Sequence, residues 1–213
     1  MEEISWFISN LSIYSIALPA MVGLVFYHRL QFYQKGIFLL IILSLGADLA
    51  ARIVVENGGN HQYVYRIFTI VEFILLTYVF AQGIVPFLTK RFFWGVGIAF
   101  LSFALIDLLW ISDIEQFNSY TTAVEGILML FFALVFFYKT LIELKIKELE
   151  KSPFVWLSVG VLLYFSSSLF IFLFTNYFEH SRNSLFIIWG IHGIFSILLN
   201  ITYSIILWIQ PAK

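Results

Sequence analysis

Two carboxylates stand inside long apolar runs of this 213-residue chain, and each lies in the same local pattern. Glu72 belongs to the stretch Thr-Ile-Val-Glu-Phe-Ile-Leu that starts at Thr69, and Glu125 belongs to Thr-Ala-Val-Glu-Gly-Ile-Leu from Thr122. The shared pattern is Thr-x-Val-Glu-x-Ile-Leu. Residues three apart lie on one side of a helix, so each threonine shares a helix face with its glutamate. A charged side chain within an apolar span is costly, and its default interpretation is functional.

Other polar residues in apolar runs extend this set. Asp48 and Arg52 are four apart and can pair, and Arg66 is three residues before Thr69. Asp107 lies near the end of a later run. A last stripe of hydrogen-bonding groups contains Trp189, His192, Ser196, Asn200 and Tyr203. The predicted ligand- or proton-binding residues are therefore Asp48, Arg52, Arg66, Glu72, Asp107, Glu125, His192 and Asn200.

The charge balance of this set restricts its chemistry. Four carboxylates face two arginines and one histidine. In a low-dielectric site, four uncompensated negative charges are not tolerated. Either at least one carboxylate is protonated, or a cation occupies the site. Both alternatives stay open at this point.

Each residue also has a structural interpretation. Arg52 and Arg66 can reach the outer headgroups from helix ends, Asp107 can be interfacial, and Asn200 can hydrogen-bond between helices. Glu125 can pair with an arginine, and His192 fits a neutral core histidine better than a metal ligand. Glu72 is hardest to explain structurally, because it lies roughly 14 Å deep at about 1.5 Å per residue.

The elements that position these residues are membrane helices. The chain is 61% hydrophobic and 20% aromatic, which is more apolar surface than a soluble domain of this size can bury. A spanning helix needs about 20 mostly apolar residues. The sequence predicts a single all-α, polytopic membrane domain over residues 1–213, with seven transmembrane helices at about 6–27, 36–55, 62–82, 92–111, 120–138, 153–175 and 184–210. Pro19 predicts a local kink in the first.

Basic residues in the linkers predict the orientation. Alternate linkers carry Arg29 and Lys35, then Lys90 and Arg91, then several lysines between Lys139 and Lys151. The N-terminus is therefore predicted outside and the C-terminus in the cytoplasm. All candidate site residues then fall in the outer half, and the inner half is packed with Phe, Leu, Ile and Val. The run from Lys139 to Lys151 is predicted to continue the fifth helix, supported by Glu143 and Lys147 four apart.

The two Thr-x-Val-Glu-x-Ile-Leu stretches suggest an internal duplication. Both lie on helices that run from outside to inside, and each follows a helix with an acid near its outer end, Asp48 or Asp107. A duplicated hairpin of helices 2–3 and 4–5 would arrange the acids in a quasi-symmetric ring. Chance matches between short apolar stretches are the alternative.

The residues that several known chemistries require are absent from the sequence. No predicted span contains the lysine of a retinal Schiff base, so a rhodopsin-type pigment is excluded. The His-Glu-x-x-His zinc motif, a Gly-rich phosphate loop and a Gly-x-Ser-x-Gly elbow are absent. The near-zero net charge gives no case for nucleic acid. A divalent metal remains an option, and its ligands would be Asp48, Glu72, Glu125 and His192.

Three segments carry a family resemblance: Tyr65-x-x-Phe68-x-x-x-Glu72-Phe73, the stretch Leu-Leu-Tyr-Phe-Ser around Tyr164, and Asn200-x-x-Tyr203. With these segments the chain resembles uncharacterised seven-helix inner-membrane proteins of Bacteroidota-type bacteria. The resemblance implies a multi-pass protein of the bacterial inner membrane and no activity.

The leading functional hypothesis is a receptor-like or ligand- or ion-binding membrane protein, which speaks against enzymatic activity but leaves it open. Besides the lipid bilayer, its partner would be a cytoplasmic or membrane protein that contacts Lys139–Lys151. One alternative is a metal-dependent intramembrane hydrolase that acts on lipids, with Asp48, Glu72, Asp107, Glu125 and His192 as ligands and bases. Others are a proton-coupled transporter with Glu72 as proton carrier, and a subunit of a larger membrane complex.

Overall fold

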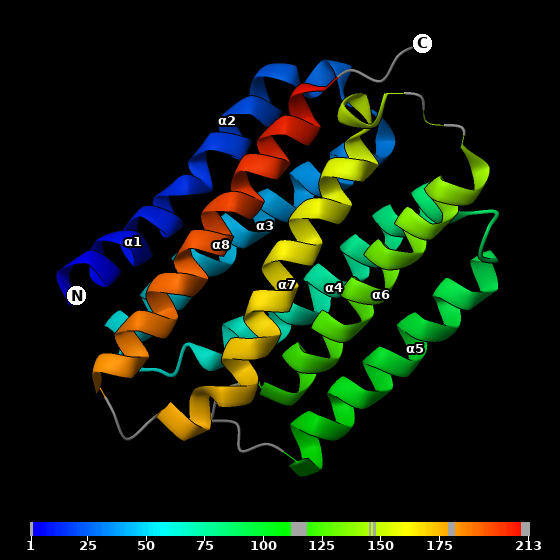
Figure 1. Cartoon of the computed structure of the whole chain (residues 1–213). Helices are drawn as coiled ribbons and strands as arrows, with labels where there is room; N and C mark the ends of the chain where they lie inside the picture. The colour runs from blue at the N-terminus through cyan, green and yellow to red at the C-terminus, as the bar shows by residue number, and fades with distance from the viewer. Residues whose placement is uncertain (1, 112–118, 145, 147, 179–181, 210–213) are drawn as a thin grey trace.

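The computed structural model describes residues 2–111, 119–144, 146, 148–178 and 182–209, and within them it is entirely helical, with no strand. Long apolar runs without water as a partner satisfy their backbone groups internally, which an α-helix does within one segment. The elements are α1 Glu2–Ser15, α2 Ala17–Phe26, η1 Tyr27–Arg29, α3 Phe32–Glu56, α4 Gln62–Ile84, α5 Lys90–Ile106, η2 Asp107–Ile111, α6 Ser119–Glu143, η3 Leu149–Lys151, α7 Pro153–Phe178 and α8 Arg182–Trp208 (Figure 1).

Six helical segments are long and apolar enough to cross a membrane. Within α7, the segment Pro153–Leu169 is also apolar. A multi-pass membrane protein is therefore the class to which this bundle belongs. The number of seven spans and the orientation stay predictions. The six segments are Phe7–Arg29, Phe32–Glu56, Gln62–Ile84, Lys90–Ile111, Tyr120–Glu143 and Ile188–Trp208.

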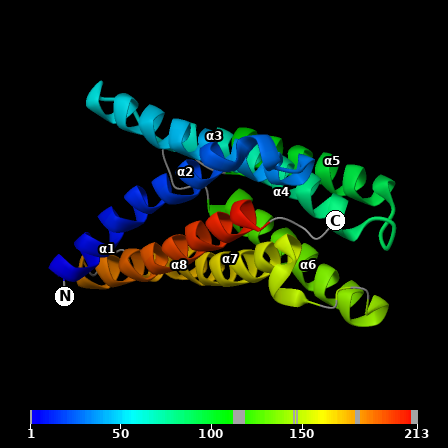
Figure 2. The same cartoon turned by 90° about the horizontal axis from the view of Figure 1, so that it is seen from above.

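The helices form two layers, which Figure 2 presents edge-on. One layer consists of α3, α4 and α5, and the other of α1, α8, α7 and α6 in spatial order. The layers meet where α4 packs against α6, and α2 packs against both α8 and α3. Helices α1 and α3 are not a closely packed pair, and in Figure 2 the N-terminal end of α1 lies away from the C-terminal end of α3. The layers are thus closed on one side and open on the other.

The first span is broken at Ile16, between α1 and α2. Pro19 explains this position, because proline lacks an N–H and its ring clashes with the carbonyl four residues earlier, that of Ser15. The predicted kink is therefore present, three residues before the proline. Its consequence is a first helix that follows α8 and a second that turns toward α3.

Aromatic and aliphatic packing fills the half of the bundle toward the C-terminal ends of α4, α6 and α8. Phe73 of α4 stacks on Phe100 of α5, with ring centroids 3.7 Å apart. The fully buried Gln34 of α3 donates its Nε2 to the carbonyls of Ile206 and Ile209, at 2.7 and 3.0 Å. These two carbonyls end α8 and have no intrahelical partner, so Gln34 satisfies them and fixes α3 against α8.

The predicted helical extension of the fifth span is wrong beyond Glu143, where α6 ends. Leu144 has a φ of 48°, and its N–H bonds the carbonyl of Thr140 at 3.1 Å. This left-handed residue terminates the helix, because it cannot continue right-handed backbone. A short helix, η3, follows at Leu149–Lys151. Lys145 and Lys147 lie outside the described residues, and so does the expected pair of Glu143 with Lys147.

Candidate functional site

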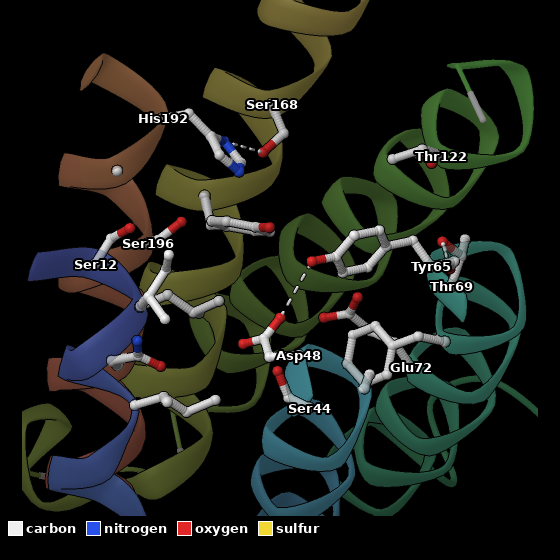
Figure 3. A pocket seen from close by; sticks show the side chains of 18 of the residues that line it. Ser12, Ser44, Asp48, Tyr65, Thr69, Glu72, Thr122, Ser168, His192 and Ser196 are labelled. Carbon is white, nitrogen blue, oxygen red and sulfur yellow. Dashed lines mark hydrogen bonds between the residues drawn. The ribbon is translucent and has the colours of Figure 1, made fainter. Parts of the chain in front are cut away.

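A cavity of about 570 Å³ lies between the two layers, lined by α1, α3, α4, α6, α7 and α8 (Figure 3). Helix α5 contributes no residue to it. The lining combines apolar side chains with carboxylates, hydroxyls and aromatic rings. The polar residues that line it are Ser9, Ser12, Ser44, Asp48, His61, Gln62, Tyr65, Thr69, Glu72, Thr122, Glu125, Tyr164, Ser168, Trp189, His192, Ser196, Asn200 and Tyr203.

Both repeated Thr–Glu pairs face this cavity. Thr69 and Glu72 do so from α4, and Thr122 and Glu125 from α6. The three-residue spacing explains the shared direction within each pair. Glu125 is 1% exposed, and Glu72 is half-buried. Two helices from opposite layers thus each present one glutamate to the same space.

The two glutamates interact with each other and with two tyrosines. The charges of Glu72 and Glu125 are close enough to act on one another, and both act on the phenols of Tyr164 and Tyr203. Glu125 Oε1 and Tyr203 Oη are buried and have no hydrogen-bond partner among the described residues. A buried polar atom without a partner costs about 1–3 kcal/mol. These two atoms are therefore available to something that fills the cavity.

Asp48 is the third carboxylate of the cavity. It accepts a long hydrogen bond of 3.5 Å from the hydroxyl of Tyr65 on α4, drawn in Figure 3. Arg52 acts on Asp48 through its charge but forms no direct salt bridge with it in the described residues. Asp48 is thus only loosely held, and Arg52 is exposed on the outside of α3.

Helices α7 and α8 form another part of the cavity wall. The imidazole of His192 lies between the rings of Tyr164 and Trp189, with centroid distances of 5.4 and 5.8 Å. Ser168 Oγ approaches His192 Nδ1 at 3.5 Å. Asn200 donates its Nδ2 to Ser15 Oγ at 2.7 Å, so this amide joins α8 to the first span. His192 and Asn200 therefore line the cavity while also serving the packing of the wall.

Asp107, Arg66 and Arg52 do not line the cavity. Asp107 is fully buried elsewhere, where its Oδ2 accepts a 2.6 Å hydrogen bond from Thr121 Oγ1 at the start of α6. Arg66 is also buried, at 6% exposure, whereas Arg52 is exposed and can reach headgroups. The structure thus brings together Asp48, Glu72, Glu125, His192 and Asn200 at the cavity. Three of the four acids expected to form a ring line it, and Asp107 does not.

Sequence analysis alone did not identify six polar groups of this cavity: Ser9 and Ser12 of α1, Ser44 of α3, His61 and Gln62 at the start of α4, and Tyr65 as a partner of Asp48. A signal for the first two exists, because Ser9, Ser12 and Ser15 recur at three-residue steps and so share one helix face. Ser44 is likewise four residues before Asp48. The same spacing rule would have found them.

The geometry bears on the metal alternative. Among the described residues, no three side chains of histidine, aspartate or glutamate are grouped closely enough to hold one metal ion. The proposed ligands Asp48, Glu72, Glu125 and His192 all line the cavity, but no three of them are grouped closely enough to share one metal ion. No lysine or arginine is among the lining residues in the described part of the chain.

The cavity ends in the apolar half of the bundle. Between Glu72 and the end of α4 there is no charged residue, and the same is true of α6 between Glu125 and Lys139. Fully buried side chains fill this half, so that the site has a closed apolar floor. They include Ile37, Ile41, Phe73, Leu76, Phe80, Ile84, Met129, Phe132, Leu157, Ile206 and Leu207.

Comparison of the chain with models of known protein families, with curated proteins and with solved structures finds no match. The functional argument therefore depends on the geometry of the cavity.

Proposed function

We propose that the protein is a receptor-like membrane protein that binds a small ligand in the cavity between its two layers. The observation that carries this proposal is the pair of buried, unpartnered atoms Glu125 Oε1 and Tyr203 Oη, both on cavity-lining residues. Native structures pair nearly all buried polar atoms. Two exceptions at one cavity are expected where a ligand completes the hydrogen bonds.

The size and lining of the cavity support this function. Ligand sites generally have volumes of about 300–1,000 Å³ and combine an apolar surface with a few polar groups. The cavity of about 570 Å³ lies within this range. Convergence of six helices on it means that an occupant touches both layers at once.

Helices α4 and α6 connect the cavity to the opposite end of the bundle. Each of these helices carries one cavity glutamate. At the opposite end, Lys139 Nζ of α6 donates a 2.7 Å hydrogen bond to the carbonyl of Gly83 on α4. A ligand that changes the separation of Glu72 and Glu125 therefore acts on this contact. In our proposal the membrane is a bacterial inner membrane and the cavity faces outside. A partner protein binds the basic linker that follows α6.

The alternatives receive less support. A proton-coupled transporter needs polar groups through the membrane, and neither α4 nor α6 has a charged residue along the floor of the cavity. A metal-dependent lipid hydrolase needs a ligand set, which the described residues do not form. No specific observation supports the alternative that the protein is a subunit of a larger complex.

The test blocks the cavity without changing its charge. Ser196 lines the cavity on α8, and a Ser196→Trp substitution would fill part of it. We expect small molecules that raise the unfolding temperature of the detergent-solubilised wild-type protein to lose this effect in Ser196→Trp, because they stabilise only the state that binds them. The measurement is a thermal-shift screen of a chemically diverse library.

Ser166→Trp is the matched control, since Ser166 lies on the exposed face of α7 and outside the cavity. This variant should respond to the same compounds as the wild type. Compounds that stabilise all three proteins equally would bind elsewhere. If every stabilising compound behaved so, the proposal would be wrong.

A further inference from the structure

We propose that the ligand is an organic cation, whose ammonium group lies between Glu72 and Glu125 and whose apolar body fills the rest of the cavity. This inference rests on the proposed function and adds the chemical class of the ligand. Three observations lead to it: the sign of the charges that line the cavity, the position of the aromatic rings, and the excess of space over what an inorganic ion needs.

The charges of the lining have one sign. Asp48, Glu72 and Glu125 line the cavity, and no lysine or arginine does so among the described residues. Like charges in a space of low dielectric repel strongly, and a buried charge needs a partner. Arg66 and Arg52 do not supply one at the cavity wall. A cation that enters the cavity relieves the repulsion, whereas an anion would increase it.

Aromatic rings line the same cavity as the two glutamates. Tyr164 and Tyr203 lie within the electrostatic influence of both Glu72 and Glu125. An ammonium group beside carboxylates and aromatic faces is stabilised by ion pairing and by cation–π attraction, which is worth about 2 kcal/mol or more when desolvated. The unpartnered Tyr203 hydroxyl presents its oxygen, which carries a partial negative charge, to the same cation. Aromatic and acidic residues together are the recurrent chemistry of amine recognition.

The space available favours an organic over an inorganic ion. A water molecule takes about 30 Å³ of liquid volume, so a hydrated metal ion with a few waters would leave most of the cavity of about 570 Å³ unfilled. Close ligation of a bare ion needs at least three grouped ligands, which the described residues do not provide. The apolar part of the lining suits a hydrocarbon body. It comprises Ile13, Ile16, Leu40, Ile41, Ala47, Phe68, Phe165, Gly193 and Leu199.

A set of three probes of nearly equal shape tests the charge. Benzyltrimethylammonium is cationic, neopentylbenzene is its neutral isostere, and benzylsulfonate is an anion of similar size. The protein would be held in phosphatidylcholine nanodiscs, with empty nanodiscs as reference, and binding measured by titration calorimetry. We expect the wild type to bind the cation at least tenfold more tightly than either other probe, because only the cation offsets the carboxylates.

Glutamine substitutions locate the binding. Glu72→Gln and Glu125→Gln should each weaken binding of benzyltrimethylammonium about tenfold, because each removes one charge without changing shape. The matched control is Glu56→Gln, at the exposed end of α3 and outside the cavity, which should leave affinity unchanged. If a glutamine variant failed to fold, the three-probe comparison on the wild type would still decide between the charge classes.

The outcomes separate this inference from the proposed function. Tighter binding of neopentylbenzene or benzylsulfonate that Ser196→Trp abolishes would overturn the organic cation and leave a ligand-binding cavity. The same holds if sodium chloride alone gave a stabilisation that depends on Glu72 and Glu125. If Ser196→Trp bound every ligand and probe as well as the wild type does, both the proposed function and the organic cation would be overturned. Equal binding of the cation by Glu72→Gln, Glu125→Gln and the wild type would also contradict the inference.

Discussion

Two almost fully buried carboxylates, Asp107 of η2 and Glu125 of α6, have opposite surroundings. Asp107, at 0% exposure, accepts a 2.6 Å hydrogen bond from Thr121 and closes the contact between η2 and α6. Glu125, at 1% exposure, lines the cavity and leaves its Oε1 without a partner. Burial alone therefore does not identify a functional acid. The state of hydrogen bonding does, since a satisfied carboxylate stabilises the fold and an unsatisfied one awaits a partner.

Two adjacent threonines of α6 show the same contrast between a hydrogen-bonded side chain and one that lines the cavity. Thr121 points to Asp107, and Thr122 lines the cavity with Glu125. A helix turns about 100° per residue, so adjacent residues serve different sides of α6. Thr121 faces the packing with η2 and Thr122 faces the site, and Glu125 lies in the angle between these two directions. The predictions below test this division, from the largest expected effect to the smallest.

The two carboxylates should respond to removal with opposite signs of stability change. Asp107→Ala should lower the free energy of unfolding by about 2 kcal/mol, because it leaves the buried Thr121 hydroxyl unpaired and opens a small cavity. Glu125→Gln should raise it by about 1 kcal/mol, because it removes an unsatisfied buried charge. Unfolding in mixed dodecyl maltoside and dodecyl sulfate micelles, followed by circular dichroism, measures both. Destabilisation by Glu125→Gln would mean that this carboxylate is structural.

The two threonines should differ in the same way but by less. Thr121→Val keeps the side-chain shape and removes the donor to Asp107, so we expect a loss of about 1 kcal/mol of stability. Thr122→Val, the matched control one residue on, should change stability by only a few tenths of a kcal/mol, because Thr122 faces the cavity. The same micelle titration applies. Equal losses in the two variants would show that the two sides of α6 are not distinct.

The smallest effect is expected at the third acid. Tyr65→Phe removes the 3.5 Å hydrogen bond to Asp48, and Tyr65 is 37% exposed. A long bond at a partly exposed site contributes little, so the unfolding free energy should fall by less than about 0.5 kcal/mol. A loss as large as that of Thr121→Val would indicate that Asp48 belongs with Asp107 rather than with the cavity.

Local rules predicted much of the fold. Apolar runs about 20 residues long indicated the spans, and Pro19 indicated a break that the structure has at Ile16. The end of α6 escaped prediction, because the segment after Tyr138 has good helix formers and no glycine or proline. The left-handed Leu144 terminates it against these propensities. Propensity is a weak guide where tertiary contacts decide the backbone.

The candidate site was predictable to the extent that helix faces reveal it. The Thr–Glu spacing placed Glu72 and Glu125 on faces that both meet the cavity. Asp107 resembled Asp48 in the sequence, yet α3 borders the cavity and α5 does not. The sequence carries no signal for which neighbour a helix packs against. That depends on contacts between distant segments, which hydrophobic periodicity does not encode.

The hydrogen bond between Asn200 and Ser15 joins residues 185 positions apart. It belongs to the packing of α1 against α8, which brings the first and last helices of the chain together. During synthesis the ribosome makes α8 long after α1, so α1 lacks this neighbour until α8 has been made. Until α8 inserts, the part of the cavity wall that contains His192 and Asn200 is missing. The cavity around Asp48, Glu72 and Glu125 is then incomplete. Assembly of the site is thus a late event in biogenesis, and a chain interrupted before α8 would carry the acids without the cavity.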